Sequence, residues 1–149
     1  MGAFLTDADF AIDSPRNIPR LLTRVRFAVL EALDRELAPF DISAAQLIVL
    51  ALVANGEATS ASSLCKGISY DPGAMTRMLD RLEQKGLIRR RPDPDDRRTT
   101  KLELTDEGRA LYPELAATKS KIQRQFLKGF TEAEVDTLAR LLGRMYDNR

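Results

Sequence analysis

The chain has 149 residues, enough for one compact domain with helical extensions, and an ordinary hydrophobic fraction of 44%. No apolar run approaches the roughly 20 residues of a membrane span, and the N-terminus lacks the basic and apolar regions of a secretory signal. With a single cysteine and no targeting segment, we expect a cytoplasmic protein without membrane attachment.

Positive charge is concentrated in one segment. Residues 77–101 hold nine cations and five anions, a net of +4, so the rest of the chain carries −3 against a total of +1. A near-neutral protein with its positive charge gathered in this way suits a surface that contacts phosphates. The alternative interpretation is a solvated surface loop.

The first third of the chain predicts two long helices. Residues 1–15 show no clear period and are expected to form a loosely held arm. Across residues 16–38 apolar side chains recur at helical spacing, which predicts a helix with a wide apolar stripe. Ser43 and Gln46 have the spacing of a capping box, and the helix they start, 43–54, is apolar almost all round and therefore expected to be central.

Two further helices follow. The segment ASSLCKGI predicts a short helix ended by Gly67. Asp71 is a good N-cap and Pro72 a good first helical residue, and Gly86 is the expected stop of the helix they begin. Its inward-facing residues are expected to be Met75, Met78, Leu79 and Leu82.

A hairpin is predicted next. Residues 87–90 read as a strand, and the segment from Pro92 to Asp96 is expected to turn because it holds two prolines and three aspartates. Residues 101–104 alternate polar and apolar, as in a half-buried returning strand. The two strands and the loop between them are predicted to make a hairpin, or wing.

The C-terminal part predicts two helices. Thr105 caps the first of them, with anions in its first turn and a possible disturbance at Pro113. Thr131 and Glu134 have capping-box spacing and begin a last helix that extends to about residue 147.

The order helix, short helix, turn, helix, hairpin is that of a winged helix-turn-helix, in which the last helix enters the major groove of DNA. Gly73 and Ala74 would let the helix start approach closely, and Arg77 can bind a phosphate or a guanine edge. In the wing, arginine suits a narrow minor groove, and Asp96 is expected to hold the direction of Arg98. The candidate DNA-contacting residues are Gly73, Ala74, Thr76, Arg77, Arg81, Asp96, Arg97 and Arg98.

The segment TRMLDRLEQKGLIRRRPDPDDRRTTKLELTDEG is similar to the signature of the MarR (multiple antibiotic resistance regulator) family of bacterial transcription factors. The matching parts are T-R-x-L-D-x-L-E-x-K-G-L-I-x-R, then D-x-R at Asp96 and Arg98, then L-T-x-E-G. The resemblance implies a homodimer, a DNA site of two half-palindromes and control by a small molecule.

The fold expected from this resemblance is mainly α, a winged helix-turn-helix with a two- to three-stranded wing. Residues 16–149 would form a single domain, with the DNA-binding lobe at 43–104 and dimerisation helices at 16–38 and 106–149. A winged helix-turn-helix needs about 70–90 residues to form a core. The long helices with apolar stripes lie outside that core, and we expect them to pack against a second copy of the chain. Packing of these helices within one chain is the alternative.

By resemblance, an effector cleft would be lined from helix 16–38, the start of helix 43–54 and the helix after Thr105. An anionic, aromatic or phenolic ligand would need an arginine beside apolar walls. The candidates are Arg16, Arg20, Arg24, Phe40 and Tyr112. Solvated arginines, a core phenylalanine and a dimer-interface tyrosine are the alternative interpretations.

The leading hypothesis is a regulator of transcription, most simply a repressor, that binds an inverted-repeat operator in duplex DNA. Without histidine or a cluster of metal ligands, neither a zinc sensor, a cofactor nor an enzyme is expected. A ligand-independent architectural DNA-binding protein is the first alternative. A redox-sensing regulator using Cys65 is the second, although Leu64 and Ile68 beside this residue indicate a buried structural thiol.

Overall fold

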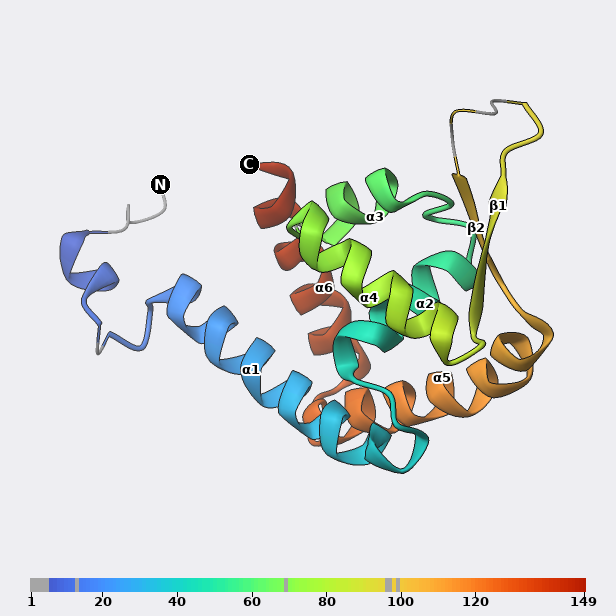
Figure 1. The fold of residues 1–149 in the computed structure, drawn as a ribbon. Coiled ribbons are helices and arrows are strands. Elements are labelled where there is room, and N and C mark those ends of the chain that lie inside the picture. The colour runs from blue at the N-terminus through green and yellow to red at the C-terminus, as the bar shows by residue number, and fades with distance from the viewer. Residues whose placement is uncertain (1–5, 13, 69, 96–97, 99) are drawn as a thin grey trace.

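The computed structural model describes residues 6–12, 14–68, 70–95, 98 and 100–149. Over these residues the chain is mainly helical, with one two-stranded antiparallel hairpin, as the sequence predicts (Figure 1). The helices are α1 (Ile18–Leu37), α2 (Ala44–Ala54), α3 (Ala61–Ile68), α4 (Pro72–Gln84), α5 (Asp106–Phe126) and α6 (Glu132–Asp147). The strands are β1 (Ile88–Pro92) and β2 (Thr100–Leu104), and short 3-10 turns lie at Asp7–Phe10 and Ala38–Phe40.

Local capping sets the starts of the helices. The Asn17 side chain accepts a hydrogen bond from the Arg20 amide, so α1 begins two residues later than expected. The capping box of Ser43 starts α2, and that of Thr131 starts α6. The Asp71 carboxylate accepts the Ala74 amide at 2.8 Å and starts α4 where the sequence predicted.

Three details differ from expectation. Gly67 lies inside the last turn of α3, which ends at Ile68. Pro92 was predicted to turn but is the last residue of β1, paired with Thr100. A proline is tolerated here because β1 is an edge strand of a two-stranded sheet, where the missing N–H need not serve a ladder bond. Pro113 does not break α5, which is continuous from Asp106 to Phe126.

The core surrounds α2, which is buried on most sides. The second half of α1 packs on it through Ala32, Leu33 and Leu37, and α5 adds Leu115 and Ile122. From the other side come the inward residues of α4, of which Met75, Leu79 and Leu82 are buried and Met78 half-buried. The resulting lobe carries α4 and the wing on its outer surface (Figure 1).

The root of the wing is tied to both neighbouring helices. Gly86 has a φ of +70°, and its carbonyl accepts the Thr105 hydroxyl, while the Thr105 amide donates to the Leu87 carbonyl at 3.1 Å. A Cβ on Gly108 would lie 2.1 Å from that carbonyl oxygen, so only glycine fits at this crossing. The end of α4, the start of β1 and the start of α5 therefore form one joint.

The wing has a third support. The Leu102 amide of β2 donates to the Thr59 carbonyl at 2.8 Å, which links the strand to the segment before α3. The sheet itself has two strands among the described residues, within the expected two to three.

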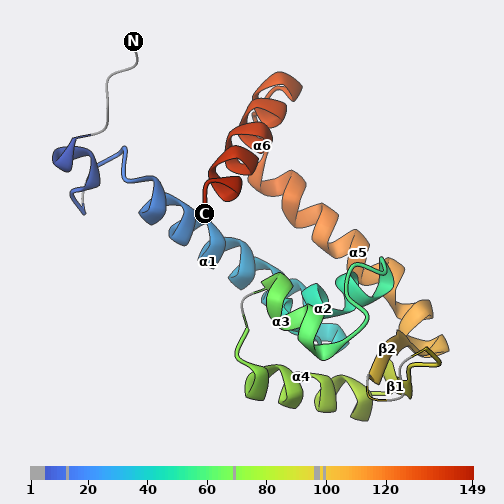
Figure 2. The ribbon, with the colours of Figure 1, turned by 90° about the horizontal axis from the view of Figure 1, so that it is seen from above.

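The two ends of the chain differ from the lobe. Every residue from 18 to 28 is exposed, and α6 has no buried residue. Figure 2 shows α6 standing apart from α4 and the wing. The large apolar side chains exposed on these two segments are Ile18, Leu21, Leu22, Val25, Phe27, Leu138, Leu141, Leu142, Met145 and Tyr146.

Among the described residues, no single helix has the length and apolar character to cross a membrane. One sharply bent pair, Ile18–Phe40 with Ala44–Ala54, reaches that threshold by length and composition when both are taken together.

Candidate nucleic-acid interface

The outer face of α4 carries five of the candidate DNA-contacting residues. Because Met75, Leu79 and Leu82 are buried, the opposite side of the helix is turned to solvent. Gly73, Thr76, Arg77 and Arg81 are exposed there, and Ala74 is half-buried. The residues picked out by helical periodicity thus lie together on one surface.

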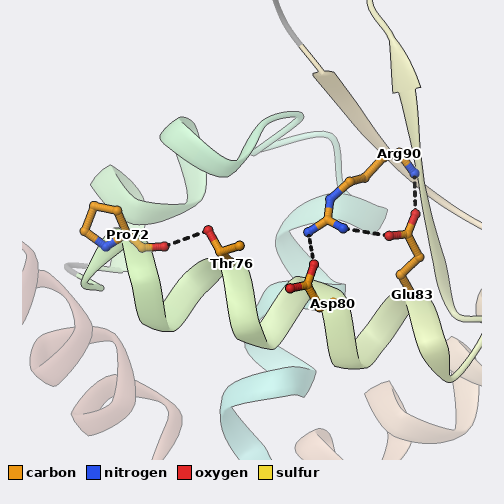
Figure 3. Close-up of polar contacts among 5 residues, drawn as sticks. All are labelled: Pro72, Thr76, Asp80, Glu83 and Arg90. Atoms are coloured by element: carbon orange, nitrogen blue, oxygen red, sulfur yellow. Dashed lines mark hydrogen bonds and ion pairs between the residues drawn. The ribbon is translucent and has the colours of Figure 1, made fainter.

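Two of these residues also make contacts within the helix. The Thr76 hydroxyl donates to the Pro72 carbonyl at 3.0 Å, which fixes its side chain near the start of the helix (Figure 3). A Cβ on Gly73 would lie 3.1 Å from the Asp71 carboxylate, so the glycine leaves room for the capping side chain. Gly73 therefore has a role in capping that the sequence analysis did not anticipate.

Arg77 and Arg81 supply positive charge to this face. They lie about one turn apart on α4, at the spacing of side chains that share a helix face. Both are exposed, and no ion pair joins either of them to another part of the chain that the structure describes. Their guanidinium groups are therefore available to an anionic partner.

The arginines of β1, unlike Arg77 and Arg81, form ion pairs within the chain. Arg90 contacts Asp80 at 2.7 Å and Glu83 at 2.6 Å, both from α4 (Figure 3). Arg89 contacts Glu103 of β2 at 3.1 Å, and Arg91 lies 3.8 Å from the same carboxylate. These three cations, which were counted as part of the basic segment, face carboxylates.

The carboxylates that pair with Arg90 also shift its pKa. Partial burial lowers the pKa of Arg90, but its hydrogen bond to Asp80 and the negative charges of Glu83 and Asp80 outweigh that effect and raise the pKa overall. The two carboxylates of α4 therefore stabilise the Arg90 cation.

The tip of the wing is described in part. Arg98 is exposed in the segment between the strands. Asp96 and Arg97 lie outside the described residues, as does the predicted pairing of Asp96 with Arg98.

The predicted effector residues are not brought together. Arg16, Arg20 and Arg24 are exposed, the last two on the first half of α1. Phe40 in the turn after α1 and Tyr112 in α5 are half-buried and pack against the core. None of the five lines the hollow between α1 and the start of α2.

A hollow of about 160 Å³ lies between α1, the start of α2 and the segment after α3. Its walls include Leu30, Ile48 and Tyr70, with Arg26 and Asp34 as charged groups. Asp34 accepts the Ala44 amide at 2.6 Å, so its carboxylate is fixed at the start of α2. Arg26 comes from the same helix as the predicted effector residues Arg20 and Arg24 but is not one of them, because helical spacing alone does not show which arginine faces α2.

Cys65 is the single cysteine of the chain and lies on α3. Cys65 on α3 is half-buried against the core rather than fully buried, so the thiol is more accessible than its neighbours suggested. Redox sensing by this residue stays a hypothesis from the sequence. In the part of the chain that the structure describes, no three His, Cys, Asp or Glu side chains are grouped to hold a metal ion.

Helix α4 in the position of a recognition helix, the wing tied to its end and the helical core behind them define a winged helix-turn-helix DNA-binding protein. Residues 42–100 match the model of the MarR family. The chain is 35% identical over 127 residues to the transcriptional regulator PecS of Dickeya dadantii, covering 83% of this chain and 76% of PecS. It is 38% identical over 111 residues to the multiple antibiotic resistance protein MarR of Escherichia coli, covering 74% of this chain and 77% of MarR.

A solved structure gives the same result. The fold is similar to the crystal structure of a mutant E. coli MarR complexed with operator DNA, with a TM-score of 0.78 and 35% identity over 87% of this chain and 93% of that one. The chain belongs to the MarR family. It is a DNA-binding regulator of transcription, not an enzyme.

Proposed function

We propose that the protein is a dimeric repressor that binds an inverted-repeat operator and is released from it by a small organic acid. The observation that carries the proposal is the exposed face of α4 with Arg77 and Arg81, beside a wing fixed to the same helix. Two relatives support the regulatory part: MdtR of Bacillus subtilis, 31% identical, is named a transcriptional repressor, and E. coli MarR has been solved with operator DNA.

In the proposed complex α4 lies in the major groove. Gly73 and Ala74 have small side chains, which allow the first turn to approach the bases. Thr76 and Arg77 follow on the same face and are proposed to contact base edges or phosphates, and Arg81 a phosphate. Arg98 is proposed to contact the adjacent minor groove or backbone, and the roles of Asp96 and Arg97 rest on the sequence alone.

The dimer is proposed from the exposed apolar surface at the two ends of the chain. The first half of α1 and all of α6 present large apolar side chains that make no core within the protomer. A two-fold dimer would bury the same surfaces of both copies and place two recognition helices about one DNA turn apart.

The effector is proposed to bind in the hollow at Arg26. A carboxylate would pair with the Arg26 guanidinium, while an aromatic ring would contact Leu30, Ile48 and Tyr70. Because Asp34 lines the same hollow, a ligand with a hydroxyl donor fits better than a simple carboxylate. Arg16, Arg20, Arg24, Phe40 and Tyr112 remain alternative contacts within the dimer.

Sequence-selective binding is the first test. The purified protein would be used to select duplexes from a random pool, and the affinity of the enriched duplex would be compared with that of a shuffled one. A regulator should lose about 1–3 kcal/mol for each mismatched base pair of the site. Uniform affinity for all duplexes would instead favour an architectural DNA-binding protein.

Effector release is the second test, with 2-hydroxybenzoate as the probe. The probe should lower the affinity of the wild-type protein for the selected duplex and have a much weaker effect on Arg26→Ala. Arg35→Ala is the matched control, because it removes the same charge from an exposed position of the same helix, outside the hollow and outside the candidate effector residues. Equal loss of response in both variants, or a response that survives Arg26→Ala, would place the effector elsewhere.

A further inference from the structure

We propose that Arg90 is a positioning residue that fixes the wing to the recognition helix, and that operator specificity depends on it. The inference rests on the proposed function, since it concerns how the two DNA-contacting elements are held relative to each other. It assigns Arg90 no contact with DNA.

The geometry is a bridge between β1 and two turns of α4 (Figure 3). One terminal nitrogen of Arg90 lies 2.7 Å from Asp80 Oδ1, and the other lies 2.6 Å from Glu83 Oε2. The Arg90 backbone amide also donates to Glu83 Oε1 at 3.3 Å. Both carboxylates of α4 that face the wing are therefore engaged by a single residue of the strand.

Only arginine suits this bridge. Its planar guanidinium presents donors in two fixed directions, whereas a lysine ammonium is a single point charge. The Arg90 side chain is only 29% exposed, which makes its hydrogen bonds less open to competition by water than those of a surface ion pair.

The bridge lies next to the proposed DNA contacts. Asp80 immediately precedes Arg81 and follows Arg77 by three residues on α4. Arg90 pairs with Leu102 in the wing ribbon, between the root of the wing and its tip. Holding Asp80 and Glu83 thus fixes the angle at which the wing leaves the turn of α4 that carries the arginines.

A pair of substitutions separates positioning from simple electrostatics. Asp80→Ala with Glu83→Ala removes two negative charges near the DNA, so electrostatics alone predicts tighter binding of any duplex. If the carboxylates serve to hold Arg90, the same double variant should bind the selected duplex more weakly. The two explanations predict changes of opposite sign.

The expected result for Arg90→Ala is a loss of about tenfold or more in the ratio of affinities for selected and shuffled duplex. The double variant should show a similar loss. Arg90→Lys should recover only part of the ratio.

Arg89→Ala is the matched control. It removes the same charge from the neighbouring residue of the same strand, but its partner Glu103 lies within the ribbon. Its ratio should stay within about threefold of the wild type, because the connection to α4 is intact. Equal losses in Arg89→Ala and Arg90→Ala would overturn the inference, as would tighter binding of the selected duplex by the double variant.

Hydrogen exchange gives a readout that needs no DNA. In Arg90→Ala and in the double variant, the amides of β1 and β2 should exchange faster while those of α2 keep their protection. If no duplex is enriched in the selection, the proposed function fails, yet this exchange pattern still tests the bridge. Unchanged protection of the wing in both variants would overturn the inference independently.

Discussion

The winged lobe and the two ends of the chain contrast sharply in how they use apolar residues. In the lobe, leucines of α2, α4 and β2 are almost fully buried by one another, as Leu47, Leu79 and Leu102 illustrate. In α6, Leu138, Leu141 and Leu142 are 38–47% exposed. The lobe buries its apolar side chains within one chain, whereas the two ends keep apolar side chains exposed to solvent.

This difference separates two kinds of stability. Burial within the lobe stabilises each protomer at any protein concentration. Burial of the ends, in the proposed dimer, would stabilise the assembly by a free energy that grows with the logarithm of the protein concentration. Substitutions in the two regions should therefore have effects that depend differently on the amount of protein.

The largest effect is expected from Leu79→Ala in the lobe. Leu79 is 1% exposed in the inward face of α4, and truncating a buried leucine costs about 2–5 kcal/mol of unfolding free energy. Denaturant titration would measure the loss, and the loss should not depend on protein concentration. A cost below about 0.5 kcal/mol, the usual range for a surface residue, would contradict the buried position.

Leu141→Glu in α6 is expected to cost about 3 kcal/mol of dimerisation free energy, because it introduces a charge into an apolar interface in both copies. In an isolated protomer the residue is 47% exposed, so the same substitution should scarcely change folding. Analytical ultracentrifugation would follow the dimer, and circular dichroism the fold. An unchanged dimer would show that α6 is not the interface and would remove the contrast between lobe and ends.

Arg77→Ala should weaken binding of the selected duplex by about 1–3 kcal/mol while leaving the dimer intact, because the substitution removes a base or phosphate contact from an exposed side chain. A gel-shift titration measures the loss, and sedimentation checks the dimer. Wild-type affinity in this variant would refute the assignment of the α4 face.

The smallest effect is expected from Arg98→Ala. A wing contact with a groove or phosphate should add to affinity with little influence on stability, so its loss should reduce the salt slope of binding by about 1. Affinity measured at several salt concentrations gives that slope. An unchanged slope together with unchanged affinity would mean that the wing tip does not reach the DNA.

The sequence predicted those parts of the fold that local chemistry decides. The caps at Ser43, Asp71 and Thr131 involve side chains and amides a few residues apart, so their pattern is readable from the chain. The inward face of α4 was equally readable, since helical periodicity separates it from the face with Arg77. The strand reached Pro92 because pairing with Thr100 extends it, which no local signal shows.

The parts that the sequence did not predict depend on contacts between distant segments. Arg90 was grouped with the cations of the basic segment, but its partners Asp80 and Glu83 come from the preceding helix. Arg26 was passed over because the hollow forms only when α1, α2 and the segment around Tyr70 pack together. In both cases the charge was visible in the sequence and its environment was not.

The bonds at the root of the wing connect it to α5, so a rotation of this helix would move the wing. Its 21 residues span about 31 Å, and its first turn is bonded through Thr105 to Gly86 and Leu87. Because Gly108 lies directly against the Leu87 backbone, the start of α5 and the start of the wing are packed closely together. A tilt of about 5° at the far end of α5 would move the base of the wing by roughly 3 Å, the length of a hydrogen bond. A rotation of α5 and the wing by this small angle would thus shift the wing relative to bound DNA by about the length of a hydrogen bond.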